Sequence, residues 1–314
     1  MKKKATTDLF RDYYCLYAQK RLDQSTIDLT DLAFRRFVDF AGDVDIDSIS
    51  LDDCELYLSY LVDVGCAKRT ANNYVKAVGR VFNWAVEHGR IESNPFERVG
   101  FFKIPQKPAK VYTVSELQSL LVAASGDEVM QAYIWLGINT LRKGEVMNLT
   151  RADIDFENDV IKIQPKYRTA GTWDWQPKNR KLRYVPMISV VKKILLDRIK
   201  DLPAYQPYVN LSPRRYGYML ARMDELTERQ KKKPFQNFDR NFRRLRSRVF
   251  VDGDYHQLRR TGLTMMLEEG EAPHVVQVIA GHSNIKTTQR YIGWKDSYLS
   301  GALGSINRAV SSVG

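Results

Sequence analysis

The last sixty residues of the sequence contain side chains whose chemistry suits attack on a phosphodiester. His256 and Arg259 are three residues apart, a Gly281-His282 step follows, and Tyr291 comes nine residues after that histidine. An arginine forks onto two phosphate oxygens and keeps its charge at any working pH. A histidine donates hydrogen bonds or carries a proton, and a tyrosine hydroxyl becomes a nucleophile once its proton is removed. Each element occurs by chance in many proteins, but their order and spacing are specific.

This pattern resembles that of the tyrosine recombinases of the phage-integrase type, similar to the Xer integrases. Two upstream segments carry the resemblance further. INTLRKGEVMNLTRADIDF resembles the family's first arginine box, with Arg142 at the active-site arginine and Glu145 at its supporting glutamate. PKNRKLRYVP resembles the β-hairpin segment whose leading lysine is catalytic, here Lys178. The resemblance covers nearly the whole chain and is strongest from about residue 112 onward.

The resemblance implies an active set of six residues, namely Arg142, Lys178, His256, Arg259, His282 and Tyr291. The two arginines suit a pentacoordinate phosphorane, which carries extra charge on its equatorial oxygens. Tyr291 would form a phosphotyrosine ester that conserves the energy of the broken bond, so rejoining needs no ATP. Lys178 would protonate the leaving 5′ oxygen as a general acid. No cofactor is implied, and the sequence offers no carboxylate cluster of the kind that holds two magnesium ions.

The hairpin lysine is the one assignment of the six that has alternatives in the sequence. Pro177 precedes Lys178 where threonine is common in the family, and the loop before it is long. Lys166 lies in a similar QPK context, so Lys166 and Lys181 are alternatives. Lys178 is preferred because its segment keeps the family's spacing to Arg183 and to Val185-Pro186.

The elements that position these residues are expected to form two domains. Residues 1–100 have the periodicity of an all-helical domain, with helices over 26–41, 49–65 and 70–89 and Thr70 as a helix N-cap. The resemblance identifies it as a SAM-like, core-binding domain. A proline-containing linker follows at 101–111. Residues 112–314 would form a mainly helical catalytic domain with a small antiparallel β-sheet, as in the DNA breaking-rejoining enzymes.

The catalytic domain begins with a marked helix start. Thr113 and Glu116 have the spacing of a capping box. Residues 159–163 and 181–187 have the composition of two β-strands, separated by a long polar and aromatic excursion, and the pattern from Val190 onward is helical again.

The charge balance indicates a polyanionic partner. The formal net charge is +12 with a pI of about 9.5, and each neutralised phosphate releases condensed counterions. We expect duplex DNA to meet Lys76 and Arg80 on the 70–89 helix. We also expect contacts from the basic run 229–248, which includes Arg240, Arg243 and Arg244 and has Asp239 as its one acid. The alternative for each of these side chains is a solvated helix face.

The C-terminal tail has one apolar face, made by Leu299, Leu303, Ile306 and Val310. The resemblance implies that this helix docks into a neighbouring protomer, so that four protomers assemble on two DNA partners and exchange strands through a Holliday junction. The alternative is packing on its own domain. Accessory DNA-bending or directionality proteins are further expected partners.

Targeting and cysteine patterns favour a cytoplasmic, nucleoid-associated protein. No apolar stretch approaches the ~20 residues of a membrane span, and the basic N-terminus lacks the apolar core of a signal peptide. The three cysteines predict neither a disulfide framework nor a zinc site.

Two other functions compete: a type IB topoisomerase-like enzyme that relaxes DNA, and a DNA-binding regulator with a silent active site. Among recombinases, the long hairpin loop favours integration of a mobile element over chromosome-dimer resolution.

Overall fold

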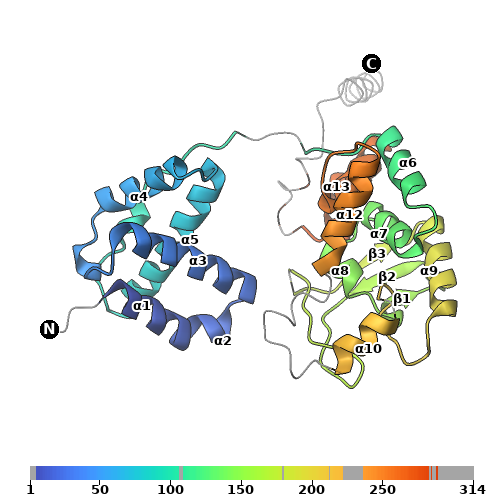
Figure 1. Ribbon diagram of the computed structural model, residues 1–314, viewed down its shortest axis with the longest axis horizontal. Helices are drawn as coiled ribbons and strands as arrows, with labels where there is room; N and C mark the ends of the chain where they lie inside the picture. The colour runs from blue at the N-terminus through green and yellow to red at the C-terminus, as the bar shows by residue number, and fades with distance from the viewer. Residues whose placement is uncertain are drawn as a thin grey trace, which may run out of the picture. The chain divides into compact units, whose positions relative to one another are not determined.

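A computed structural model describes residues 5–105, 109–178, 180–211, 213–221 and 236–282, together with Asn284 and Thr288. The chain divides into two compact units, Met1–Gln106 and Lys107–Gly314 (Figure 1). The predicted class, a helical first domain with a mainly helical second domain that holds a small antiparallel sheet, is confirmed. Tyr291, the tail helix and residues 229–235 of the basic run lie outside the described residues. Within the described residues, no helix is long and apolar enough to cross a membrane.

The first unit is helical. Its elements are α1 (Thr6–Tyr13), a π-helical turn (Tyr14–Ala18), α2 (Gln19–Arg21), α3 (Gln24–Ala41), a 3-10 turn (Ile46–Ser48), α4 (Leu51–Asp63), α5 (Lys68–Glu87) and a 3-10 turn (Pro95–Arg98). They enclose a core rich in aromatic side chains, in which the Phe37 ring packs edge-on against Tyr57 and Phe82. This core gives the first unit its own hydrophobic interior.

Helix α5 carries the apolar stripe that its sequence predicts. Val75, Val78, Phe82 and Ala85 are all buried. The predicted N-cap at Thr70 is wrong, because the helix begins two residues earlier, at Lys68. Its first turn already closes there, with the Thr70 amide donating to the carbonyl of residue 67 at 2.7 Å.

The start of the connecting segment is held on the first unit. The Asn72 side chain, on α5, donates to the Phe102 carbonyl at 2.9 Å and accepts from the Phe102 amide at 3.2 Å. The Lys68 ammonium lies 5.2 Å from the centre of the Phe102 ring. Phe102 is therefore fixed by the same helix that was expected to face DNA.

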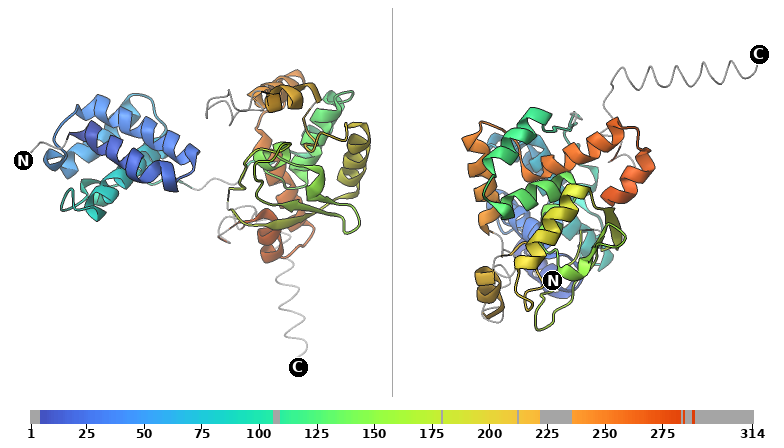
Figure 2. Two further views of the ribbon diagram at one scale, coloured as in Figure 1. Left: turned by 90° about the horizontal axis from the view of Figure 1, so that it is seen from below. Right: turned by 90° about the vertical axis from the view of Figure 1, so that its right-hand side faces the viewer.

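The second unit places helices around one short sheet (Figures 1 and 2). Its helices are α6 (Val114–Ala123), α7 (Glu128–Ile138), α8 (Lys143–Met147), α9 (Ser189–Asp201), α10 (Pro213–Ala221), α12 (Gln236–Arg248), α13 (Tyr255–Glu268) and α14 (Pro273–Ala280). The predicted capping box at the start of α6 is present, with the Thr113 hydroxyl accepting from the Glu116 amide and the Glu116 carboxylate accepting from the Thr113 amide.

The sheet has the order β1 (Ile154–Asp155), β2 (Val160–Ile163) and β3 (Arg183–Pro186), with antiparallel pairing throughout. Both predicted strands are confirmed, and β1 is an additional short strand. In the register, Ile161 lies opposite Val185 and Ile163 opposite Arg183, and all four side chains are buried. The sheet therefore places Arg183 on its core face, at the point where the long excursion returns to β3.

Helices α7 and α13 approach each other at their backbones. A β-carbon on Gly262 would lie 1.8 Å from the Ile138 carbonyl oxygen, so only glycine permits this contact. The close packing brings the start of α13, with its histidine and arginine, beside the end of α7, where the first arginine box begins.

Candidate active site

The first arginine box folds into a turn that aims Arg142. Thr140, just before it, has a positive φ of 70°, and Arg142 occupies the N-cap position of α8. The Arg142 amide donates to Glu145 Oε2 at 2.7 Å, and its Nη1 donates to Glu145 Oε1 at 3.0 Å. The carboxylate thus fixes both the backbone and the guanidinium of Arg142, whose side chain remains 18% exposed.

Glu145 is held in turn by Arg183, which sequence reasoning used only as a spacing marker. Arg183 Nη1 and Nη2 donate to the two oxygens of Glu145 at 2.8 and 2.6 Å. Burial by itself raises the pKa of Glu145, but the Arg183 hydrogen bonds and the charges of Arg183, Arg142 and Arg259 outweigh it and bring the pKa to about 2. Glu145 is therefore a fixed anion among cations at any working pH.

The HxxR pair lies on the first turns of α13. Asp254 caps this helix by accepting from the Gln257 amide at 2.8 Å. His256 and Arg259 are one turn apart, so their side chains leave the same face of the helix. His256 is exposed, whereas Arg259 is fully buried and donates to the carbonyl oxygens of Thr140 and Ala280. Arg259 thereby connects α13 to the first arginine box and to the end of α14.

The Gly-His step ends α14. Gly281 adopts a left-handed conformation with φ 61°, and its carbonyl accepts from Arg142 Nη2 at 3.2 Å. His282 donates its amide to the Gln277 carbonyl at 3.1 Å, and its Nδ1 lies 3.0 Å from the Thr288 hydroxyl. Sequence reasoning missed Thr288 as a partner of His282.

Both histidines are electrostatically biased toward the neutral form. Desolvation, followed by the positive charges of Arg259 and Arg142, lowers the pKa of His282 to about 4. Partial desolvation of its ring and the charges of Arg259 and Arg260 also lower the pKa of His256, to a smaller extent because this residue is exposed. Arg142 contributes to both shifts, and His256 also acts on His282. Hydrogen bonds to the Gly281 and Ala280 carbonyls place the Arg142 and Arg259 guanidiniums beside the segment that carries His282, and His256 lies one turn before Arg259 on α13. At neutral pH each imidazole can accept a proton on one ring nitrogen.

The long excursion between β2 and β3 is partly docked on the domain. Lys166 pairs with Trp175 by two backbone hydrogen bonds of 2.8 and 3.0 Å. Trp173 stacks on Tyr208 with ring centres 3.8 Å apart and donates from Nε1 to Asn148 at 2.9 Å. These contacts dock residues 166–175 on the domain, and Pro177 beyond them is also buried.

The three candidate lysines differ in their surroundings. Lys166 is buried, with its ammonium 2.6 Å from Asp153 Oδ2 and 5.7 Å from the centre of the Trp175 ring. Lys178 and Lys181 are exposed in the short loop before β3. Because the buried Lys166 ammonium is already paired with Asp153, Lys178 is a better candidate than Lys166 for the general acid.

The expected DNA contacts have mixed surroundings. On α12, Phe238, Phe242 and Leu245 face the core, whereas Arg240, Arg243 and Arg244 are exposed. Asp239 pairs with Lys143, next to Arg142, at 2.7 Å, which fixes α12 beside the active cluster. On α5, the Lys76 ammonium lies 4.7 Å from the Phe101 ring centre, and Arg80 donates to the Thr30 hydroxyl at 3.2 Å.

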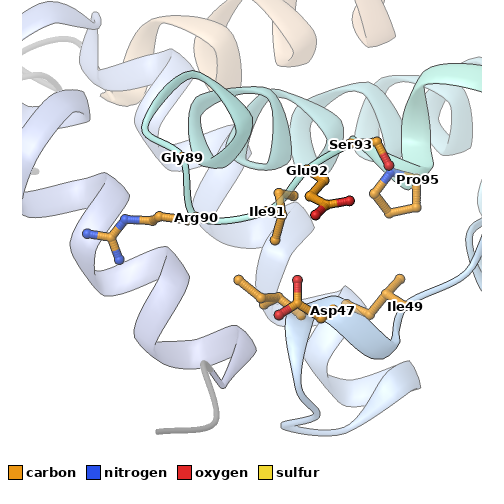
Figure 3. A pocket seen from close by; sticks show the side chains of 9 residues that line it. Asp47, Ile49, Gly89, Arg90, Ile91, Glu92, Ser93 and Pro95 are labelled. Atoms are coloured by element: carbon orange, nitrogen blue, oxygen red, sulfur yellow. The ribbon is translucent and has the colours of Figure 1, made fainter. Parts of the chain in front are cut away.

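An open pocket of the first unit contains none of the predicted active set. It is lined by residues 46, 47, 49, 89–93 and 95 (Figure 3). Arg90 at its edge pairs with Asp12 at 2.6 Å and lies over the Trp84 ring. These contacts assign Arg90 a structural role.

Comparisons with known proteins match the two units separately. The Phage integrase family matches residues 110–297, more than half of the chain, and the Phage integrase SAM-like domain matches residues 8–104. Tyrosine recombinase XerC of Pediococcus pentosaceus is 24% identical over 90% of this chain and 91% of that protein. The transposase from transposon Tn916 of Enterococcus faecalis is 25% identical over 78% of this chain and 63% of that protein.

Solved structures share the fold across both units. The Tn1549 transposon integrase in complex with transposon right end DNA has a TM-score of 0.74 and 22% identity, covering 98% of this chain and 99% of that one. A lambda integrase tetramer bound to a Holliday junction has a TM-score of 0.65 and 16% identity, covering 89% of this chain and 78% of that one. The two-domain integrase fold is thus common to all three.

Proposed function

We propose that this chain, which belongs to the phage integrase family of tyrosine recombinases, cuts and rejoins duplex DNA at specific sites through a covalent 3′-phosphotyrosyl bond to Tyr291. One observation carries the proposal: Arg142, the start of α13 with His256 and Arg259, and His282 come from three separate segments of the chain and form a single positively charged cluster. Such a cluster suits a phosphate that gains negative charge during attack.

In the proposed reaction, the Tyr291 oxygen attacks phosphorus and forms a new P–O bond while the bond to the 5′ oxygen breaks. Arg142 and Arg259 bind the non-bridging oxygens. A neutral imidazole, His256 or His282, accepts the phenol proton, and Lys178 gives a proton to the leaving 5′ oxygen. Rejoining is the reverse, with the 5′ hydroxyl of the partner strand as the nucleophile.

The larger assembly is part of the proposal. Four protomers would hold two duplexes, exchange one pair of strands at a time through a Holliday junction, and contact one another through the C-terminal helix. The lambda integrase tetramer on a Holliday junction supports this arrangement by its shared fold. Similarity to the transposase of Tn916 supports integration of a mobile element as the biological role of the reaction. Accessory DNA-bending proteins are proposed as further partners. The exposed arginines of α12, together with Lys76 and Arg80, would contact the DNA backbone. The protein would act in the cytoplasm, in association with the nucleoid.

The proposal is tested by trapping the covalent intermediate. Suicide duplexes from the native locus, nicked near the crossover, are incubated with the wild type and with Tyr291→Phe, and covalent adducts are resolved by denaturing electrophoresis. We expect an adduct with the wild type that is lost in the mutant. An equal adduct in both would exclude Tyr291. DNA binding without any adduct would favour a silent regulator, and relaxation of plasmids that lack a specific site would favour a topoisomerase.

A further inference from the structure

We propose that Arg183 is a positioning residue of this active site: it orients Arg142 through the carboxylate of Glu145 and supports the turn that leads to His282. The inference rests on the proposed function, because it assigns Arg183 a part in DNA cleavage. The Arg183 side chain is only 9% exposed. Its three nitrogens donate to Glu145 and to the Ile279 carbonyl, so its guanidinium is engaged by protein groups and acts on the reaction through them.

Arg142 and Arg183 share one carboxylate, that of Glu145. Glu145 Oε1 accepts from Arg142 Nη1 at 3.0 Å and from Arg183 Nη1 at 2.8 Å. Glu145 Oε2 accepts from the Arg142 amide at 2.7 Å and from Arg183 Nη2 at 2.6 Å. Arg183 therefore supplies one of the two hydrogen bonds at each oxygen. Without it, the carboxylate would be free to rotate, and the two contacts that aim Arg142 would loosen.

Arg183 also affects the charge that Arg142 presents to the phosphate. A carboxylate paired with Arg142 alone would cancel the charge that Arg142 offers to DNA. Two guanidiniums, Arg142 and Arg183, share the single charge of Glu145, so this group keeps a net charge of about +1. Arg183 thus allows Glu145 to orient Arg142 without neutralising it.

The Arg183 side chain also contacts the end of α14. Arg183 Nε donates to the Ile279 carbonyl at 3.0 Å, in the last turn of α14. Arg142 Nη2 donates to the Gly281 carbonyl two residues later. Arg183 consequently connects β3, the start of α8 and the end of α14. It links the loop that carries Lys178 to the segments that carry Arg142 and His282.

The test compares three variants of the full chain. Arg183→Lys keeps the positive charge but cannot donate two parallel hydrogen bonds to Glu145, and Arg183→Met removes both the charge and the hydrogen bonds. Lys162→Met is the control, because it removes a more exposed cation from the neighbouring strand. The single-turnover cleavage rate of a nicked duplex is measured over a range of protein concentrations that extends to saturation of the DNA. Thermal melting checks that each variant is folded. We expect Arg183→Met to lower the maximal rate on the order of 100-fold with little change in the half-saturating concentration. Arg183→Lys should recover part of that rate, and Lys162→Met should match the wild type.

A measurement that needs no cleavage keeps this inference separate from the proposed function. In the isotope-labelled protein, the Nε–Hε signal of Arg142, assigned with Arg142→Lys, reports the order of its side chain. We expect an ordered signal in the wild type and in Lys162→Met, and a mobile one in Arg183→Met; if that variant does not fold, Arg183→Lys takes its place and should show partial disorder. An ordered Arg142 in the folded Arg183 variant, or a wild-type cleavage rate there, overturns the inference. A wild type that never cleaves DNA overturns the proposed function instead, while the order of Arg142 still decides the role of Arg183.

Discussion

The backbone of Gly281 lies directly against the Arg183 side chain. A β-carbon on Gly281 would approach Arg183 Cδ to 2.8 Å and Nε to 3.2 Å, and the residue also has a left-handed φ of 61°. Glycine satisfies both conditions at once. The turn before His282 therefore depends on a residue without a side chain, packed on the arginine that holds Glu145.

Gly281→Ala is expected to impair cleavage more than its strain alone explains. The new methyl group must displace Arg183, and a left-handed alanine costs roughly 1–2 kcal/mol. Gly65→Ala is the matched control, because Gly65 also has a positive φ, 92°, but a β-carbon there would meet nothing within 4 Å. Thermal melting and single-turnover cleavage are measured for both variants. Similar melting losses with equal cleavage rates would show that the Arg183 contact has no effect on the reaction.

Two of the three candidates for the hairpin lysine, Lys166 and Lys178, predict different defects. Lys166→Met leaves the buried Asp153 without its cation and should destabilise the domain by about 3 kcal/mol, measured by denaturant unfolding. Because Lys178 is exposed, Lys178→Met should leave the free energy of unfolding unchanged while slowing cleavage. A substrate whose leaving 5′ oxygen is replaced by sulfur should restore the Lys178→Met rate, because a thiolate leaves without a proton. No restoration would remove the general-acid role from Lys178.

Much of the fold was predictable because each segment carries its own local signal. The capping box at Thr113, the stripe on α5 and the strand around Val185 follow from spacing that acts within one element. The role of Arg183 was not predictable, because it depends on a carboxylate 38 residues away and on the end of α14. Sequence periodicity does not specify such a long-range contact. It could have shown, however, that Arg183 takes a core-facing position in a strand that alternates buried and exposed residues, which is unusual for an arginine.

The docking of the excursion was also beyond the sequence pattern. Its polar and aromatic composition predicted a long loop, and it gave no indication that Trp173 would stack on Tyr208 or that Lys166 would pair with Trp175. Both partners of each pair lie in segments of irregular structure, where local propensity carries little information. The predicted preference for Lys178 rested on spacing alone. Burial of Lys166 beside Asp153 argues against Lys166, while Lys181 stays an alternative.

Two helix glycines should respond oppositely to alanine. Gly262→Ala places a methyl group 1.8 Å from the Ile138 carbonyl oxygen and must separate α13 from α7, so we expect a loss of about 3 kcal/mol or more. Gly217→Ala on α10 meets nothing within 4 Å and should stabilise the protein by about 0.5–1 kcal/mol through helix propensity. Denaturant unfolding of both variants checks this. A tolerated Gly262→Ala would contradict the close packing that aligns His256 and Arg259 with the first arginine box.

Stability should fall on acidification through His282. Its folded-state pKa of about 4 lies below the value of about 6.5 for free histidine, so the unfolded chain binds a proton first. The contribution of His282 is complete above pH ~6.5 and is lost as the pH falls toward 4, with a slope of at most ~1.4 kcal/mol per pH unit. His282→Gln should flatten the measured slope between about pH 6.5 and about pH 5, whereas exposed His274→Gln should not. Equal slopes in the two variants would contradict the neutral imidazole on which the proposed proton transfer relies.

The arginines on the exposed face of α12 should set the salt dependence of DNA binding. Each backbone contact to a duplex contributes about −0.9 to the slope of log K against log salt concentration. Arg243→Ala with Arg244→Ala should therefore reduce the magnitude of that slope by about 1.8 and weaken binding at low salt. Lys193→Ala with Lys200→Ala, two exposed cations on α9, is the charge-matched control. Binding is measured by fluorescence anisotropy in the Tyr291→Phe background, so that DNA stays uncut. If both double variants lose the same slope, α12 contributes only general charge and does not contact the DNA backbone.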